Sequence, residues 1–450
     1  MILTSIFSND TGRPSISFTH AGAKRGNSTS APLSCGVANL CSVIALGLSG
    51  AAWGQSQLPP LQPPPPPTPV FAEAGPWNFT GVLNVDAFDS AGGGLKTGPA
   101  VLIKGALSAS YDGSKQGHDG LTGLVSMQYV NGTRFSRNFV GDAQGLDNIE
   151  ASGAVRLYEA WIAHDYADSH LGWKVGLVDL NTDFDTQETA ALFLNSSDGV
   201  GPEFSHSGRN GPSIFPTTAL AVTSYLRPKQ GWTLRAGLFD GTAGSPEYPG
   251  RFAIRISGED GLLAIGQVER RYSDNTRIEV GVWRYTASFE ALHQLDAQGQ
   301  AVRLQRSHGG YALIEGPLLK SKDSDEKGLN GWLRVGLSDP TVNKISGYIG
   351  AGVVYTGLLA RRPTDQVGLA INHAIVDQQN LSVIVAAERQ AETAIELTYR
   401  YNANDWLVVQ PDAQLIIRPS GDRTIPTALV VGVRFNITLT RALATKIKSK

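Results

Sequence analysis

The sequence predicts an all-β chain that forms a transmembrane antiparallel β-barrel of about sixteen strands, and three observations lead to this prediction. Residues 77–439 break into short β-like segments separated by Gly, Pro, Asn and Asp. Several of these segments alternate apolar and polar side chains. Glycine is abundant, at 51 of 450 residues, and no segment carries an apolar stripe with helical spacing over three turns.

The predicted strands fill the chain at roughly ten residues each plus connections, which suits a barrel of about sixteen strands. The expected segments are Phe79–Phe88, Val101–Tyr111, Gly123–Asn131, Ala154–His164, Trp173–Leu180, Ala219–Leu226, Trp232–Phe239, Leu262–Tyr272, Arg277–Thr286, Tyr311–Gly316, Trp332–Ser338, Tyr348–Thr356, Val367–Asn372, Ala394–Tyr401, Trp406–Ile417 and Ala428–Ile437.

Alternation gives each strand one apolar face and one polar or small face. In the segment 394–401, Leu397 and Tyr399 share one parity, whereas Glu396 and Arg400 share the other. An apolar face can contact lipid and a polar face can line water. Strands that span a membrane must close into a barrel, because every backbone group in hydrocarbon needs a hydrogen-bond partner.

A soluble β-sandwich or propeller also alternates, with its polar face in bulk water. Two features favour the outer-membrane type of barrel. Charges on the polar parity are sparse and of both signs, as expected for a lumen. Aromatic residues near strand ends predict the girdles that such barrels place at the two membrane interfaces; these residues are Trp173, Tyr225, Trp232, Trp283, Tyr285, Trp332, Tyr355, Tyr399, Tyr401 and Trp406.

The ends of the chain differ in composition from the body. Residues 1–54 combine a basic n-region, a short apolar stretch and small residues before Gln55, which predicts a signal peptide. An uncleaved membrane anchor is the alternative, although the apolar stretch is short for a spanning helix. Residues 55–76 are proline-rich and predict an extended periplasmic linker. Residues 77–439 form the predicted barrel, and residues 440–450 a basic C-terminal tail.

The composition argues against several classes of function. The formal net charge is −2, so the chain lacks the basic balance typical of nucleic-acid binding. Both cysteines, Cys35 and Cys41, fall in the predicted signal peptide, so we expect neither a disulfide nor a thiolate site in the mature chain. The sequence has no motif for a catalytic nucleophile, a phosphate loop or a zinc site. We therefore expect no enzymatic activity, catalytic residue, metal or cofactor.

Six sequence blocks carry a resemblance to a known family. The stretch VGLVDLNTDFDTQETAALFLNSSDGVGPEF begins at Val175, and Ile214-Phe215-Pro216 follows it. The later blocks are WTLRAGLFDG from Trp232, GVWRYT from Gly281, YTGLLARRPTDQVG from Tyr355 and ELTYRYNANDWLVVQPDAQLIIRP from Glu396. In this order, the blocks resemble those of the bacterial carbohydrate-selective porin family over nearly all of residues 77–437.

The resemblance implies an outer-membrane channel of a Gram-negative bacterium, through which mono- and oligosaccharides diffuse passively. Its expected partners are carbohydrate solutes, outer-membrane lipid and two further copies in a homotrimer, with no nucleic acid. Two alternatives remain open from the sequence: a general, non-selective porin, and a secreted soluble β-module that binds sugars. A barrel with hydrolase activity would need Ser, His and Asp together near one rim, and the sequence shows no such set.

A sugar channel needs paired hydrogen-bond donors and acceptors beside an aromatic surface, because sugars present arrays of hydroxyls and one apolar ring face. Charges and aromatics within the family-like blocks or on the polar parity are therefore the candidate pore-lining residues: Glu159, Trp161, Arg334, Arg361, Arg362, Asp365, Glu396, Arg400, Gln410, Asp412 and Gln414.

These side chains could instead form structural networks in the lumen. For Arg334, Glu396 and the pair Arg361/Arg362 the two interpretations stand about equal, since a charge on a lipid face would be costly. Asp179, Asp183 and Asp240 sit at predicted strand ends, and for them we favour a structural network in the lumen or a turn cap over contact with solutes, because aspartate favours turns.

Overall fold

The computed structural model describes residues 75–245, 248, 259–320, 327–377 and 389–442. Every described residue belongs to a single compact unit. The predicted signal peptide and residues 55–74 of the predicted linker lie outside the described residues.

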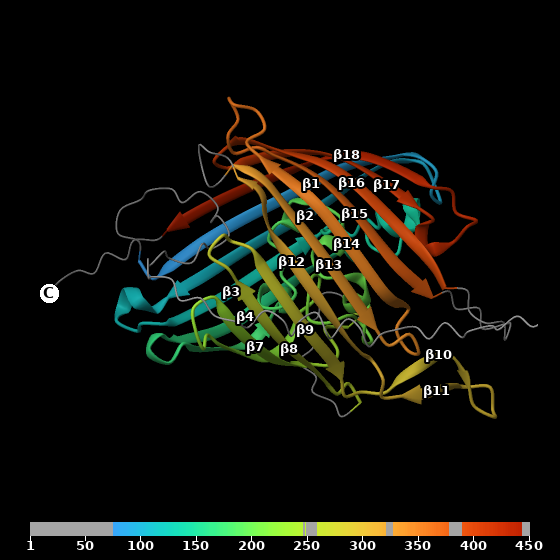
Figure 1. Ribbon diagram of the computed structural model, residues 1–450, viewed down its shortest axis with the longest axis horizontal. Coiled ribbons are helices and arrows are strands. Elements are labelled where there is room, and N and C mark those ends of the chain that lie inside the picture. Colours follow the sequence, from blue (N-terminus) through green and yellow to red (C-terminus); the bar gives the residue numbers. More distant parts are fainter. Residues whose placement is uncertain (1–74, 246–247, 249–258, 321–326, 378–388, 443–450) are drawn as a thin grey trace, which may run out of the picture. The chain divides into compact units, whose positions relative to one another are not determined.

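Sixteen antiparallel strands close into one barrel, which confirms the predicted fold class (Figure 1). Each barrel strand pairs with the next barrel strand along the chain, so that β9 pairs with β12, and β1 pairs with β18 to close the ring. The barrel strands are β1 Trp77–Gly92, β2 Gly98–Asp112, β3 Leu121–Val130, β4 Ala154–Tyr166, β5 Leu171–Val178, β6 Ala219–Leu226, β7 Trp232–Asp240, β8 Leu262–Arg271, β9 Arg277–Tyr285, β12 His308–Lys320, β13 Gly328–Ser338, β14 Ile345–Thr356, β15 Gln366–Asp377, β16 Arg389–Asn404, β17 Leu407–Ile417 and β18 Ala428–Ala442.

Each of the sixteen expected segments coincides with one of these strands, although many strands run further than expected. The predicted boundary between barrel and tail, at residues 439 and 440, falls inside β18 and is corrected to Ala442. The strand continues because its last residues pair with the beginning of β1, where Asn78 lies opposite Ala442 and Thr80 opposite Thr440. Residues 443–450 lie outside the described residues.

The connections contain one small sheet and several short helices. Strands β10 Phe289–Leu295 and β11 Ala301–Leu304 form a separate two-stranded sheet that the sequence did not predict. The helical turns are η2 Gly113–Gln116, η3 Ser136–Val140, η4 Ala167–Ser169, η5 Leu180–Thr182, η6 Ala190–Leu192, η7 Ser196–Asp198, α1 Pro202–Ser205 and η8 Pro419–Gly421. No helix in the described ranges has the length and hydropathy needed to cross a membrane.

The alternating side chains point as a transmembrane barrel requires. On β13, Leu333, Val335 and Leu337 are 41%, 38% and 68% exposed on the outer surface, whereas Arg334 is fully buried inside the barrel. On β16, Leu397 is 53% exposed and Glu396 is fully buried. Apolar side chains therefore face outwards and polar side chains face the lumen, the reverse of a soluble β-sandwich.

Three of the aromatic residues expected in the interface girdles lie elsewhere. Trp283, Tyr285 and Trp332 are only 2%, 1% and 4% exposed, so their assignment to a girdle was wrong. They share the inward parity of their strands, and parity decides the face even near a strand end. Other aromatics do lie exposed near strand ends on the outer surface, among them Trp77, Tyr166 and Tyr401.

The two rims of the barrel carry connections of different length. Both described ends of the barrel, at Trp77 and Ala442, lie at the rim with the shorter connections. The opposite rim carries the long connections 131–153, 179–218, 241–261 and 286–307. Outer-membrane barrels place short turns in the periplasm and long loops outside, so the long-connection rim is the extracellular one.

Candidate pore constriction

The connection between β5 and β6, residues 179–218, folds into the barrel and narrows its lumen; the green turns of this inward loop lie within the barrel in Figure 1. It carries the apolar residues Leu180, Phe184, Phe193 and Phe204, all at most 2% exposed. Phe204 stacks on Trp283 of β9 with ring centroids 4.7 Å apart. Apolar side chains drive this placement, because a loop in water would leave them exposed.

Arg334 of β13 binds two carboxylates of the inward loop. Its Nε and Nη2 atoms donate to Asp185 at 2.8 and 2.7 Å, and Nη2 donates to Glu203 Oε1 at 2.8 Å. All three side chains are fully buried. The guanidinium also lies between the rings of Tyr311 and Tyr348, at 5.3 and 5.4 Å from their centroids. Arg334 therefore anchors the loop and does not meet a solute in this conformation, which corrects its expected place on the pore surface.

Glu396 of β16 holds the same loop through its backbone. Its carboxylate accepts from Leu194 N at 2.6 Å and from Asn195 N at 2.9 Å. The side chain is fully buried, so Glu396 is also a loop anchor and its expected contact with solutes is corrected.

Neighbouring positions on β17 add further contacts to the inward loop. Gln410 donates to Leu192 O at 2.8 Å, and Gln414 accepts from Asn195 Nδ2 at 3.3 Å. Asp412 lies between them and is 5% exposed. These three candidates share a face of β17, as the alternation predicts, but they are buried beneath the loop.

A second ionic cluster lies on β9 and β12. Arg277 donates to Glu279 Oε2 at 2.7 Å and to Glu315 Oε1 at 2.8 Å. Glu315 in turn accepts from the backbone N–H groups of Glu188 and Thr189 in the inward loop, at 3.1 and 2.7 Å. The cluster therefore fixes the loop to a second part of the wall, which β13, β14 and β15 separate from β16 and β17.

A third cluster pairs a loop carboxyl with a neutral partner. Asn372 of β15 donates to Asp198 at 3.0 Å, and Tyr348 donates to Asn372 at 2.8 Å and to Ser197 O at 3.1 Å. Burial raises the pKa of Asp198 well above its ordinary value; the bond from Asn372 opposes this shift and the charge of Asp412 adds to it.

The connection between β3 and β4, residues 131–153, also folds inwards and packs on the first loop. Asn148 N donates to Leu194 O at 2.8 Å, and Ser196 N donates to Gly145 O at 2.8 Å. The wall holds this second loop through Arg434 of β18, whose Nη2 donates to Asp147 at 2.8 Å and to Asp86 at 2.6 Å.

Two carboxyl groups fix the backbone of the second loop. Glu392 of β16 accepts from Ala143 N at 2.7 Å and from Gln144 N at 3.0 Å. Within the loop, Glu150 accepts from Ser136 N at 2.8 Å. Burial is the main cause that raises the pKa of Glu150 from about 4.5 to about 7.

The lumen-facing side of β2, β4 and β5 keeps Lys104, Trp161 and Lys174 partly exposed, whereas Glu159 beside them is buried at 8% exposure. Trp161 Nε1 donates to Glu159 Oε1 at 3.0 Å, and the ammonium of Lys174 lies 4.8 Å from the centre of the Trp161 ring. Lys174 pairs with Asp183 of the inward loop at 2.9 Å. Glu159 and Trp161 therefore share a site, which also contains both signs of charge and an aromatic ring.

The expected loop site around Arg362 lies at the periplasmic rim, away from the inward loops. Arg362 Nε donates to Asp365 at 2.9 Å, and Asp365 also accepts from Tyr399 at 2.7 Å and from Asn402 N at 3.1 Å. These contacts fix the turn between β14 and β15. Arg361 is exposed beside them, so the pair Arg361/Arg362 is not folded into the lumen.

Arg400 and the three strand-end aspartates complete the set of candidates. Arg400 is half-buried on the lumen face of β16 and has no hydrogen-bond or ion-pair partner among the described residues. Asp179 caps η5 through a bond from Asn181 N at 2.9 Å. Asp240 accepts from Thr242 N at 3.3 Å, as expected of a turn residue. Asp183 instead forms the ion pair with Lys174.

Sequence reasoning missed the loop carboxylates Asp185 and Glu203 and the wall residues Arg277, Glu315 and Arg434. One signal could have found the loop: residues 179–218 carry many apolar side chains without strand alternation, and the lumen is where such a segment can bury them. Among the described residues, no group of three or more His, Cys, Asp or Glu is placed to hold a metal ion.

Comparisons with known proteins agree with this geometry. Residues 96–439 match the model of a family described as carbohydrate-selective porin, OprB family. Porin B of Pseudomonas aeruginosa is 25% identical over 346 residues, covering 68% of this chain and 74% of that protein. The high-pH structure of Pseudomonas putida OprB has a TM-score of 0.70 at 18% identity, covering 81% of this chain and 94% of that one.

Proposed function

Because the chain belongs to the carbohydrate-selective porin, OprB family, and is an outer-membrane channel for carbohydrates, we propose which part of its lumen the sugar contacts. The sugar passes between the inward loops and the wall formed by β2, β4 and β5, where Trp161 and Glu159 contact it. The observation that supports this path is the partial exposure of Trp161 and Lys104 on the wall. The candidates on β13, β16 and β17, except Arg400, are buried by the loops; Glu159 is also only 8% exposed, so its part in the site rests on its bond with Trp161.

The chemistry of this wall suits a sugar. The indole ring offers an apolar surface for a pyranose face, and the carboxylate of Glu159 accepts hydroxyl hydrogen bonds. Lys104 of β2 adds a donor, with its ammonium 4.5 Å from the centre of the Phe215 ring in the inward loop. Groups of both signs across a narrow passage orient polar, uncharged solutes, and weak binding lets them leave again.

Liposome swelling with variants of Trp161 tests this path. The wild-type protein should admit glucose faster than the acyclic polyol with the same number of carbons. Trp161→Ala removes the ring surface and should lower this ratio about threefold, which corresponds to a modest change in binding free energy. Trp161→Phe keeps a ring and should retain most of the ratio. An unchanged ratio in Trp161→Ala would place the sugar contact elsewhere in the lumen.

Arg400 is the second candidate for contact with solutes, because it is half-buried on the lumen face and has no described partner. Arg400→Gln should reduce anion passage relative to cation passage, measured as the reversal potential of a salt gradient across a planar bilayer.

Two finer expectations also belong to the proposal. The channel has no enzymatic activity, and it forms a homotrimer. The mass of the detergent-solubilised protein, determined by native mass spectrometry, separates a trimer from a monomer.

A further inference from the structure

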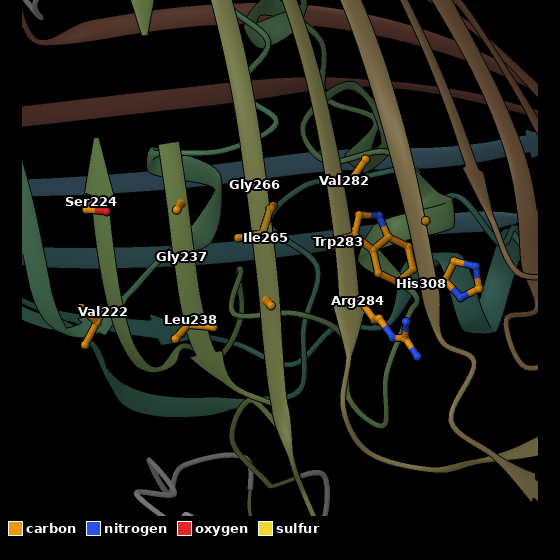
Figure 2. A pocket seen from close by; sticks show the side chains of 13 residues that line it. Val222, Ser224, Gly237, Leu238, Ile265, Gly266, Val282, Trp283, Arg284 and His308 are labelled. Carbon is orange, nitrogen blue, oxygen red and sulfur yellow. The ribbon is translucent and has the colours of Figure 1, made fainter. Parts of the chain in front are cut away.

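The outer surface of the barrel carries a hollow across β6, β7, β8 and β9, on the face that meets lipid. It encloses about 630 Å³. Its outward lining includes Ser224, Ala236, Ala264 and Gly266, whose short side chains leave the space open. Ser224 and Gly266 are labelled in Figure 2. Exposed Leu238 and Val282, at 53% and 63%, stand beside these small residues as side walls.

Strand register sets the direction of this hollow. Ser224 lies opposite Ala236, and Ala236 lies opposite Gly266, so three small side chains form one row across the strands. Ala264 belongs to the next row towards the extracellular rim, because β7 ends and β8 begins at that rim. The hollow therefore extends from near the extracellular rim towards the middle of the membrane.

Two basic side chains lie at the rim end of the hollow. Arg284 of β9 is directly opposite Ala264 on one side and His308 of β12 on the other. Both are exposed on the outer surface, side by side at one end of the hollow (Figure 2). Arg284 has no hydrogen-bond or ion-pair partner among the residues that the structure describes. A lipid-facing arginine is tolerated near the interface, where it can reach phosphate groups.

A second hollow continues on the other side of His308. It encloses about 420 Å³ between β12 and β13 and shares His308 and Gly309 with the first. Leu337 and Pro340 contribute apolar lining there. Arg306 pairs with Asp339 at 2.8 Å at its edge. His308 Nδ1 lies 3.9 Å from the same carboxylate and 2.5 Å from Arg306 O, so Arg284 is the basic group left without a described partner to meet a ligand.

We propose that this surface is a binding site for a phosphate-bearing, acylated lipid of the outer leaflet. The phosphate lies on the guanidinium of Arg284 beside His308, and one acyl chain follows Ala264, Gly266 and Ala236 towards the membrane centre. The second hollow accepts another chain of the same molecule. The positive charge at the rim and the apolar hollow below it match the order of headgroup and chain in a lipid. The site depends on the outer-membrane location and not on which solute the pore conducts.

Native mass spectrometry of the full-length protein in detergent tests the site with two probes, phosphorylated lipid A and its dephosphorylated form. The wild-type protein should bind the phosphorylated lipid more tightly. Arg284→Gln should weaken that binding about fivefold and remove the difference between the two lipids. Arg303→Gln is the matched control, because Arg303 is exposed on β11 outside both hollows and should bind like the wild type.

Filling the hollow tests the acyl-chain contact. Gly266→Leu should weaken binding of both lipids about tenfold or more, because apolar contact contributes with each buried methylene. Inorganic phosphate at millimolar concentration should not displace the lipid. A heat-modifiability gel verifies that each variant has a folded barrel.

Three results would overturn the proposal. Equal lipid binding by the wild type, Arg284→Gln and Gly266→Leu would show that the hollows are unoccupied. Displacement by inorganic phosphate would reduce the site to a simple anion site. A trimer that dissociates in Gly266→Leu while lipid binding stays unchanged would assign the surface to a second copy of the chain.

Discussion

Arg334 shows how one side chain on the wall can determine the width of the pore. A buried arginine is costly to desolvate, and its cost is offset here by two carboxylates and two tyrosine rings. The charge of Arg334 is compensated only while the inward loop lies inside the barrel, because Asp185 and Glu203 belong to that loop. Loss of the cation would leave two carboxylates buried close together without a counter-charge.

The variant Arg334→Ala should release the inward loop and widen the pore. We expect larger single-channel conductance, a smaller preference for sugars and a loss of roughly 3–5 kcal/mol in unfolding free energy, since breaking a buried ion pair strands its partners. Planar-bilayer recordings and urea unfolding measure these effects. Arg303→Ala, an exposed arginine on β11, is the control and should behave like the wild type. Unchanged conductance in Arg334→Ala would show that this residue does not hold the constriction.

Individual residues also mark what sequence reasoning could and could not give. The inward parity of Arg334 and Glu396 follows from local alternation, which a sequence reveals. The partners of these two residues do not follow from local alternation, since Arg334 binds Asp185 across a separation of 149 residues. The misplaced Trp283 and Tyr285 share the parity of Arg277 and Glu279, so parity was the better guide to their position than closeness to a strand end.

Among the elements, the strands were the most predictable. Their period of two residues is a local property, and all sixteen expected segments overlap barrel strands. The inward course of residues 131–153 and 179–218 was not predicted, because loops have no comparable period. It depends on contacts with the wall, such as Glu392 with the second loop and Glu396 with the first.

The outer face of a single strand allows a test of membrane insertion. Leu397 is 53% exposed near the middle of β16 and points away from the lumen. Leu397→Lys should therefore destabilise the barrel by about 2–4 kcal/mol, the cost of a basic side chain at the midplane. Leu397→Phe stays apolar and is the matched control. Equal folding yields in lipid vesicles for both variants would contradict the assignment of this face to lipid.

The stability of the second loop, residues 131–153, should depend on pH through Glu150. Its pKa is about 7 in the folded loop and lies near 4.5 when exposed, so the folded form binds more protons between these values. Stability of the loop should therefore fall as the pH rises from about 4.5 to 7 and then level off. The pKa of Asp198 is also raised, so the stability of the inward loop, residues 179–218, should likewise fall as the pH rises.

Hydrogen exchange of the backbone amides in residues 134–150, corrected for intrinsic rates, measures this dependence. The wild type should lose protection between pH 5 and pH 7.5. Glu150→Gln carries no ionisable group at this position and should show a flatter profile. A wild-type profile as flat as that of Glu150→Gln would rule out Glu150 as the titrating group.

At the scale of the whole molecule, the closed barrel and its two inward loops form one structure. The barrel satisfies its backbone hydrogen bonds through complete strand pairing, including β1 with β18. The loops convert a wide lumen into a constriction whose buried ionic groups face the loops, while Trp161 and Lys104 remain partly exposed to the passage. In the function that we propose, sugar preference depends on a small number of wall residues, and pore width depends on the loop anchors.

Liposome swelling by the purified wild-type protein tests the central claim most directly. Monosaccharides are compared with uncharged non-sugars of similar size and with small amino acids. A sugar-selective constriction predicts the fastest swelling with monosaccharides. Equal swelling with all solutes would contradict selectivity and leave a general pore, and no swelling at all would contradict the channel itself.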